Sequence, residues 1–259
     1  MNIILFEPFM AMDINLQQSN RKKLMKAIRL NKYLSEVGVC SRREADRLVE
    51  QGAIKVNGTL AIMGMKVLPD DVIEIHGKLI AKQEQPILLA FHKPQGIVST
   101  CASFPGQNSI IDYLNLPYRV YPIGRLDKDS EGLILLTNQG ELANAISKSR
   151  NNHEKEYIVQ VNRYITNDFI KGMSKGVPIL DTVTKPCKVK KINDRTFSII
   201  LTQGLNRQIR RMCEYFEYRV VRLQRIRIMN IRLNHLKSGA YRLITGEEYE
   251  QLVQLVNGK

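Results

Sequence analysis

The sequence has no tryptophan, only four cysteines and four histidines, and 25 acidic residues against 39 basic ones in 259 positions. The cysteines, at positions 40, 101, 187 and 213, lie far apart, with no Cys-x-x-Cys pair and no histidine at ligand spacing. A disulfide framework and the usual zinc patterns are therefore not indicated. We expect no bound metal and a reducing, cytoplasmic compartment.

Long apolar runs are also lacking. No stretch of about 18 apolar residues occurs, so no membrane-spanning helix is expected. The first twelve residues are apolar, but they lack a basic start and contain Glu7 and Pro8, which is untypical of a signal peptide. Helical periodicity begins only after residue 27, so residues 1–27 are expected to form a flexible extension.

Positive charge is what the chain has in excess. Its formal net charge is +14 and its pI is near 9.7. Between Lys185 and Arg232 there are 13 Lys and Arg residues and only three acids. This balance favours a polyanionic partner, because each neutralised phosphate releases a counter-ion.

Residues 28–80 carry the pattern of two short helices followed by a small sheet. Apolar residues in LNKYLSEV recur at helical spacing, and SRRE, with Ser41 and Glu44, is a capping box that begins a second helix. AIKVNG and DVIEIHG alternate like strands, and Asn57-Gly58 is a typical hairpin turn. About fifty residues of this kind are enough for a small binding module.

The whole segment resembles the S4 RNA-binding domain, which we place at residues 28–80. The resemblance implies RNA contact through Arg42, Arg43 and Arg47, which fall off the apolar face of the second helix. A solvated helix face is the alternative from spacing alone. The polar residues 81–86 predict a linker, and residues 87–259 a second, larger domain.

The second domain mixes strands and helices. ILLAFHKPQGIVST predicts a buried strand, a turn at residues 93–96 and a second strand. GLILLTN, EKEYIVQV, CKVKKI and TFSIILTQ predict further strands, whereas ELANAISKS and NRQIRRMCEYF have helical spacing. Because several joins have hairpin length, we predict an α+β fold with a mixed, mostly antiparallel sheet.

The stretch GRLDKDSEGLILLTN, residues 124–138, places Asp127 between Arg125 and Lys128 and just before a strand that is apolar at nearly every position. A loop that precedes a rigid buried strand is a common place for a catalytic group. Charged loops also precede ordinary strands, so the position alone leaves both interpretations open.

The helix predicted in NRQIRRMCEYF carries a second group of charges. Its apolar residues share one side, and Arg207 and Arg210 share another, whereas Arg211 points elsewhere. Such an arginine pair could hold a phosphate, a carboxylate or only water.

Four stretches of the second domain together resemble a known family. GRLDKDSEGLILLTN, KPQGIVST, EKEYIVQV and QGLNRQIRRM match, in order and spacing, motifs of the RsuA family of pseudouridine synthases, which carry an S4 domain ahead of the catalytic domain. The resemblance runs from Leu30 to Val253. It implies an isomerase that converts a specific uridine of ribosomal RNA, with 23S RNA favoured and transfer RNA open as a second substrate. The family needs no cofactor or metal.

The resemblance also implies three catalytic residues. Asp127 is the catalytic carboxylate, and Arg210 is the arginine that keeps it ionised, with Arg207 as the alternative. Tyr157 matches the tyrosine that packs on the flipped base. From alternation alone, a tyrosine at this position packs in a core just as readily.

Further residues are expected to contact RNA or to support the site. In the resemblance Arg125 enters the space that the flipped base leaves, and Lys128 lies near phosphate. The remaining expected RNA-binding positions of these motifs are Leu126, Arg207, Gln208 and Ile209. Lys93 and Pro94 are expected to form a turn that packs beneath the site.

Two other functions fit parts of the pattern. A non-catalytic RNA-binding or ribosome-assembly protein would use the same basic surface. A nucleoside hydrolase or glycosidase would need a second carboxylate, for which Asp129 is the nearest candidate. Because one chain can bind one large RNA without symmetry, a monomer is expected.

Overall fold

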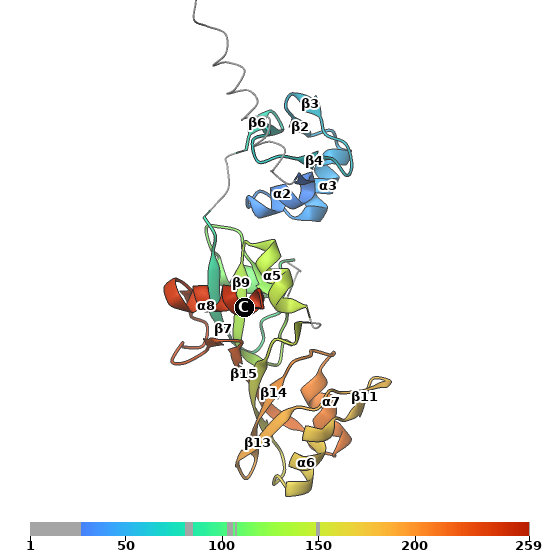
Figure 1. Cartoon of the computed structure of the whole chain (residues 1–259), viewed down its shortest axis with the longest axis vertical. Coiled ribbons are helices and arrows are strands. Elements are labelled where there is room, and N and C mark those ends of the chain that lie inside the picture. Colours follow the sequence, from blue (N-terminus) through green and yellow to red (C-terminus); the bar gives the residue numbers. More distant parts are fainter. Residues whose placement is uncertain (1–26, 81–84, 103–105, 107, 149–150, 259) are drawn as a thin grey trace, which may run out of the picture. The chain divides into compact units, whose positions relative to one another are not determined.

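The computed structural model describes residues 27–80, 85–102, 106, 108–148 and 151–258. The chain divides into two units, residues 1–84 and 85–259, which run from blue to teal and from green to red in Figure 1. The expected extension at residues 1–27 and the expected linker at 81–86 lie outside the described residues, except for residues 27, 85 and 86.

The first unit combines two helices with short strands. Ser41 begins the second helix, because its hydroxyl accepts a hydrogen bond from the Glu44 backbone N–H at 3.1 Å, as the capping box predicts. Asn57 and Gly58 both have positive φ and form the predicted hairpin turn. The elements are β1 (Ile28–Arg29), α2 (Leu30–Glu36), α3 (Arg42–Glu50), β2 (Ile54–Val56), β3 (Thr59–Leu60), β4 (Lys66–Val67), β5 (Ile73–Ile75) and β6 (Lys78–Leu79).

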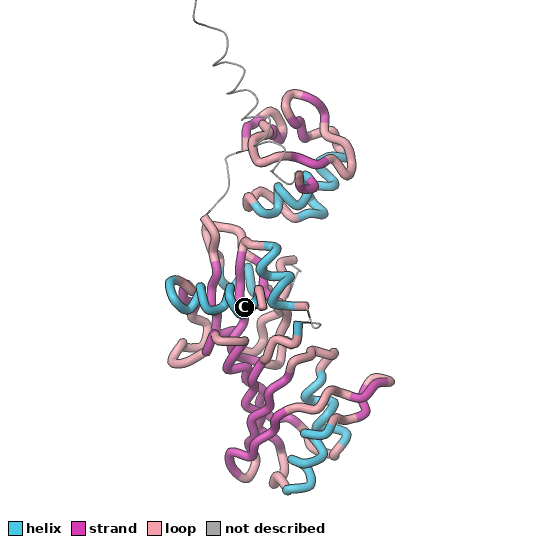
Figure 2. The backbone as a smooth tube through the Cα atoms, viewed as in Figure 1, coloured by secondary structure: helices cyan, strands magenta, loops and turns pink. Residues whose placement is uncertain are grey.

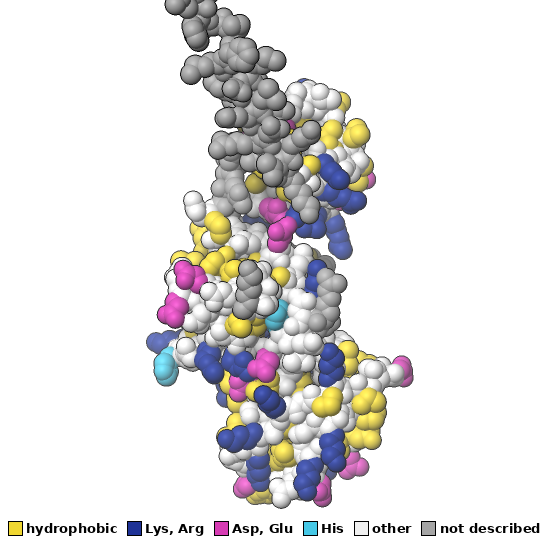
Figure 3. Space-filling view, in the orientation of Figure 1, with side chains coloured by type: hydrophobic (Ala, Val, Ile, Leu, Met, Phe, Trp, Pro, Cys, Tyr) yellow, Lys and Arg dark blue, Asp and Glu magenta, His cyan; other side chains and the backbone are white. Residues whose placement is uncertain are grey.

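The helices pack on the sheet through one small core. Leu34, Ala45 and Ile54 are fully buried in it, one from each helix and one from the strand β2. The strands pair in the order β3-β2-β5-β6, and β1 pairs with β4. On the other side of α3 the side chains of Arg42, Arg43 and Arg47 are exposed, and Figure 3 shows Lys and Arg side chains gathered over this part of the unit.

The second unit is built on a nine-stranded sheet (Figure 2). Its strands are β7 (Leu88–Lys93), β8 (Tyr121–Ile123), β9 (Glu131–Thr137), β10 (Lys155–Val161), β13 (Lys188–Asn193), β14 (Thr196–Leu201), β15 (Val220–Ile228), β16 (Ile231–Arg232) and β17 (Tyr241–Leu243). A separate hairpin joins β11 (Pro178–Ile179) to β12 (Thr182–Val183). The helices are α4 (Ile110–Leu114), α5 (Gly140–Ser147), α6 (Asn167–Lys175), α7 (Gln208–Tyr215) and α8 (Gly246–Val256). In the described part of the chain, every helix is too short or too polar to cross a bilayer.

Strand order confirms the predicted α+β fold with a mixed, mostly antiparallel sheet. The order is β13-β14-β10-β15-β9-β7-β17, with β8 on β9 and β16 on β15. Among the described strands, β9 and β15 form the one parallel pair, through Gln224 opposite Glu131 and Arg225 opposite Gly132. These two register pairs join the two halves of the sheet.

One predicted strand does not form. The sequence IVST after the turn at residues 93–96 was expected to be a strand, but in the structure it is a loop with a single bridge from Val98 to Ser109. Backbone N–H groups of this turn and segment donate to other loops and not to a neighbouring strand. The Gly96 N–H binds the Lys128 carbonyl, and the Val98 N–H binds the Asn108 carbonyl. The segment is therefore tied to the loop that carries Asp127.

Two cores on opposite faces of β9 explain its unbroken apolar sequence. Leu133 and Leu135 pack into the core with α5 and α8, whereas Ile134 and Leu136 pack into the core with α4 on the other face. A third core lies in the other half of the sheet, where α6 and α7 pack on β10 and β14. The pocket described next is lined from both halves.

Candidate active site

A pocket of about 520 Å³ lies in the second unit where the two halves of its sheet meet. Strands β10 and β15, the loop before β9 and the N-terminal end of α7 supply its walls. Among the residues that line it are the three predicted catalytic ones, Asp127, Tyr157 and Arg210. The volume is within the range of small-ligand sites.

The loop that carries Asp127 is fixed by hydrogen bonds from two segments, the loop of residues 94–100 and strand β15. The buried Ser99 hydroxyl donates to the Leu126 carbonyl at 2.9 Å and accepts from the Leu126 N–H at 3.1 Å. Gly96 N–H donates to the Lys128 carbonyl at 2.7 Å. Arg225 donates from Nη1 to the Arg125 carbonyl at 3.4 Å. The backbone on both sides of Asp127 is therefore held in place.

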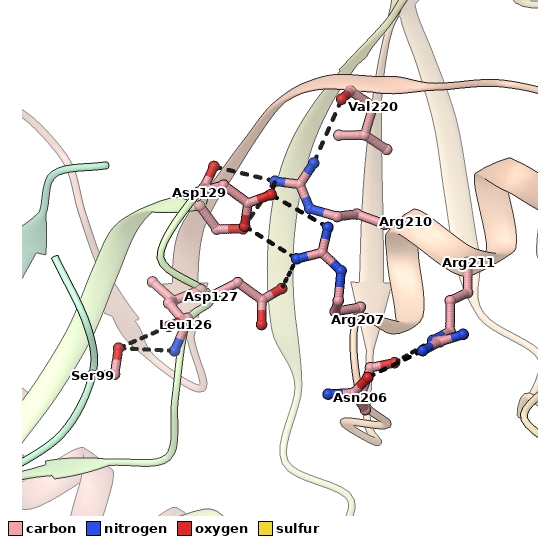
Figure 4. Close-up of polar contacts among 10 residues, drawn as sticks. Ser99, Leu126, Asp127, Asp129, Asn206, Arg207, Arg210, Arg211 and Val220 are labelled. Carbon is pink, nitrogen blue, oxygen red and sulfur yellow. Dashed lines mark hydrogen bonds and ion pairs between the residues drawn. The ribbon is translucent and has the colours of Figure 1, made fainter. Parts of the chain in front are cut away.

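Arg207 is the arginine that reaches Asp127. Its Nη1 lies 3.8 Å from Oδ2 of Asp127, and its two terminal nitrogens each donate to one carboxylate oxygen of Asp129 at 3.3 Å. Figure 4 shows the Arg207 guanidinium between the two aspartates. The motif resemblance implied Arg210 for this place, with Arg207 as the alternative, and in the structure Arg207 forms the ion pair with Asp127.

Arg210 binds Asp129 and Ser130, which follow Asp127 on the loop. Its Nη2 donates to the Asp129 carbonyl at 3.1 Å and to the Ser130 hydroxyl at 3.3 Å, and lies 3.2 Å from Oδ2 of Asp129. The Arg210 side chain is 10% exposed, whereas that of Arg207 is 41% exposed. The solvated-face interpretation of this arginine pair is therefore wrong for Arg210.

The start of α7 explains why the two arginines diverge. Arg207 is the N-cap residue and has a left-handed backbone, with φ of 50°, so it does not continue the helical spacing assumed from the sequence. Arg210 lies in the first turn of the helix and points toward the core side. Arg211 pairs with Asn206, away from the aspartates, as predicted (Figure 4).

Asp129 is held as a carboxylate. Burial raises its pKa, but the hydrogen bond from Arg207 and the charge of Arg210 outweigh burial and leave the pKa below its usual value. A carboxylate in this state is a poor general acid at neutral pH. The second acid that a glycosidase needs is therefore not supplied by Asp129.

Tyr157 lies on β10, between β14 and β15, where it is opposite Ile199 and Arg225. Its ring is half-buried, packs against two of the cores, and lines the pocket. The two interpretations of this tyrosine are therefore compatible, since one side of the ring can pack while another faces the pocket.

Lys93 lies beneath the site. Its side chain is completely buried, and its ammonium donates to the carbonyls of Pro94 at 2.8 Å and Ile97 at 2.9 Å. Burial lowers the pKa of Lys93 to about 8, against the opposing effect of Asp129 and Asp127. This geometry agrees with the predicted supporting turn.

The other residues predicted to contact RNA divide into two groups. Arg125 and Lys128 are exposed on the loop. Leu126, Gln208 and Ile209 are buried, and all three line the pocket. Gln208 also closes the turn before α7, where its Oε1 accepts the Leu205 N–H at 3.0 Å.

Three polar residues of the site were missed by the sequence analysis. Ser99 and Arg225 hold the loop of Asp127, and Lys155 lines the pocket. Lys155 had a usable signal, because it stands two residues before Tyr157 on an alternating strand and must share its face. Ser99 and Arg225 had none, since their roles depend on contacts between segments distant in sequence.

Comparison with known proteins identifies the family of the chain. A family model for RNA pseudouridylate synthase matches residues 87–215, and one for the S4 domain matches residues 28–73. The dual-specificity RNA pseudouridine synthase RluF of Escherichia coli (strain K12) is 54% identical over 232 residues, which are 89% of this chain and 80% of that protein. The ribosomal large subunit pseudouridine synthase B of Bacillus subtilis (strain 168) is 35% identical over 237 residues, which are 88% and 97% of the two chains.

A solved structure agrees in fold. The crystal structure of a pseudouridylate synthase superimposes with a TM-score of 0.63 at 26% identity and covers 88% of this chain and 99% of that one. The chain therefore belongs to the family of RNA pseudouridine synthases and carries an S4 domain. It is an isomerase, as the motif resemblance predicted.

Proposed function

We propose that Asp127 is the catalytic carboxylate that isomerises uridine to pseudouridine. The observation that carries the proposal is its position: a half-buried carboxylate on a fixed loop lines a pocket together with Tyr157, Arg207 and Arg210. The carboxylate either attacks the sugar carbon or removes a sugar proton when the bond to uracil breaks. Both routes require an ionised Asp127.

Arg207 and Arg210 have different parts in this proposal. Arg207 supplies a positive charge beside Asp127 and directs its carboxylate into the pocket, which agrees with their ion pair. Arg210 acts with Asp129, because it anchors the carboxylate that holds the Arg207 guanidinium in place. Tyr157 offers the flipped base a flat surface, worth about 1 to 3 kcal/mol per stacked base.

RNA contact would spread outward from the pocket. Arg125, which lines the pocket, and Lys128 are exposed on the loop of Asp127, suited to stacking and to phosphate. The pocket-lining Leu126, Gln208 and Ile209 would contact the flipped nucleotide. In the S4 unit, the exposed arginines of α3 would bind the phosphate backbone of folded RNA.

The names of two relatives support a substrate class. One is named as a dual-specificity RNA enzyme and another as acting on the large ribosomal subunit. We propose a uridine of 23S ribosomal RNA as the main target and a transfer RNA as the second, both met in the cytoplasm. We propose a monomer, because one chain can bind one large RNA without symmetry.

The test is to map pseudouridine in ribosomal and transfer RNA of cells that lack the protein. These cells are complemented with the wild type, with Asp127→Asn, or with Asp181→Asn as a matched control at an exposed position on the hairpin of β11 and β12. At least one site should return with the wild type and the control, and stay unmodified with Asp127→Asn. A site restored by Asp127→Asn would refute the catalytic role.

The two alternatives give different results in the same cells and extracts. A protein that only binds RNA would restore ribosome assembly equally well with Asp127→Asn. A hydrolase would release free uracil from RNA, which is measured directly in the reaction mixture. Neither outcome is expected, because the family is that of an isomerase and Asp129 is held as a carboxylate by two arginines.

A further inference from the structure

Lys155 stands on the wall of the pocket beside Tyr157. It begins β10 two residues before the tyrosine, so the two side chains leave the same face of the strand about 7 Å apart. On the neighbouring strand Arg225 is paired with Tyr157 in register, and directly opposed residues also share a face. All three residues line the pocket.

Lys155 and Arg225 have no acidic partner among the described residues. The Lys155 ammonium is within 3.5 Å of one protein acceptor there, the His153 carbonyl. Arg225 donates to the carbonyls of Leu133 and Arg125, and its Nη2 is buried without a partner. Both positive charges therefore face the pocket uncompensated.

The neighbours show that this pattern is not general for the two strands. On β15, Arg222 is paired with Glu131, and Arg227 with Glu154 and Glu156. The two glutamates flank Lys155 in sequence, yet both bind Arg227. Carboxylates are thus available nearby, but they are used by other arginines.

Keeping two such cations together is unfavourable without a ligand. Burial, followed by repulsion from Arg225, lowers the pKa of Lys155 to about 8, so the ammonium still prevails at neutral pH. A charge that is partly removed from water and left unpaired destabilises a fold. This arrangement is favourable only when a negative or strongly accepting group enters the pocket.

The reaction itself creates such a group. When the bond between the sugar carbon C1′ and uracil N1 breaks, its electron pair stays on uracil, and the two carbonyl oxygens gain negative charge. The charge disappears when C5 bonds to C1′. The proton on C5 is then lost to solvent, and N1 takes up a proton from solvent. Hydrogen-bond donors that stabilise this transient negative charge would lower the activation free energy of the reaction.

We propose that Lys155 donates a hydrogen bond to a carbonyl oxygen of the flipped uracil and stabilises the negative charge on the detached base. Arg225, which is 2% exposed, lies behind this contact and keeps the wall positive. A backbone phosphate is the less suitable ligand, because the exposed cations Arg125 and Lys128 are more accessible to it than the partly buried Lys155. The inference rests on the proposed role of Asp127.

The test compares Lys155→Met with Lys190→Met, a matched control at an exposed position on β13. With enzyme in excess over an RNA stem-loop that carries the target uridine, Lys155→Met should lower the single-turnover rate constant at least about 30-fold. Its Kd for the same RNA should stay within about threefold, because the contact forms only as the base detaches. The control should keep both values.

Two further variants make the result unambiguous. Lys155→Gln keeps a donor without the charge, so its rate should lie between wild type and Lys155→Met, and it replaces Lys155→Met if that variant does not fold. A rate for Lys155→Met within threefold of wild type, or a loss due wholly to RNA binding, would overturn the inference. If Lys155→Met gives such a result while Asp127→Asn is inactive in the same assay, only the role of Lys155 fails. An active Asp127→Asn would instead refute the proposed function.

Discussion

Replacing Lys155 by methionine should make the protein more stable while it makes it less active. Methionine keeps the length of the side chain and removes the charge that burial and Arg225 disfavour. The pKa of Lys155 falls from 10.5 to about 8 on folding. Since one pKa unit is about 1.36 kcal/mol, the charged lysine costs the fold about 3 kcal/mol at pH 7.

The stability advantage of Lys155→Met over wild type should decrease as the pH rises. At pH 7 both folded and unfolded chains hold the proton on Lys155, so the folded state carries the full penalty. As the pH rises through 8 the folded protein releases the proton first, and stability increases because the unfolded chain then binds more protons. By linkage the penalty falls to about 1 kcal/mol at pH 9.5, so the advantage of the variant should shrink by about 2 kcal/mol.

The assay is urea unfolding of the full chain, followed by circular dichroism, for wild type and variant at pH 7 and pH 9.5. Lys93 also has its pKa lowered to about 8, but it is present in both proteins and cancels in their difference. An advantage that does not change with pH, or none at pH 7, would refute the view that Lys155 is an unpaired cation in the folded protein.

Two other substitutions test how the loop of Asp127 is positioned. Gly132→Ala should destabilise the second unit by at least about 2 kcal/mol in urea unfolding, because its Cβ would overlap the backbone of Arg225 and its φ of +108° disfavours a side chain; unchanged stability would contradict the close approach of β9 and β15. Ser99→Ala should cost about 1 to 3 kcal/mol and slow single-turnover pseudouridine formation, because the N–H and carbonyl of Leu126 lose their partner. Normal rates with this variant would show that Asp127 is held without the hydroxyl.

Local patterns predicted most elements of the fold. The capping serine of α3, the Asn57-Gly58 turn and the doubly buried β9 all depend on neighbours in sequence, and each formed as predicted. The strand expected after Lys93 did not form, because its backbone groups find partners in loops that no local pattern reveals. Elements were therefore more predictable than the connections between them.

The sequence indicated which residues lie together at the pocket better than it indicated which of them contact one another. Motif spacing brought Asp127, Tyr157 and Arg210 to one pocket. The arginine beside Asp127 is nevertheless Arg207, because a left-handed backbone at this one residue turns it out of the helical register. Such a turn depends on how Gln208 closes the preceding loop, a contact that helical spacing cannot express.

The position of β15 between β10 and β9 has a consequence for biosynthesis. A ribosome makes β9 and β10 before β15, yet in the finished sheet these strands are neighbours only through β15. The nascent chain can complete its S4 unit early, since domains fold as they emerge. Its pocket, in contrast, cannot form until residues 220–228 have been synthesised, so an unfinished chain has its S4 unit before it has its candidate active site.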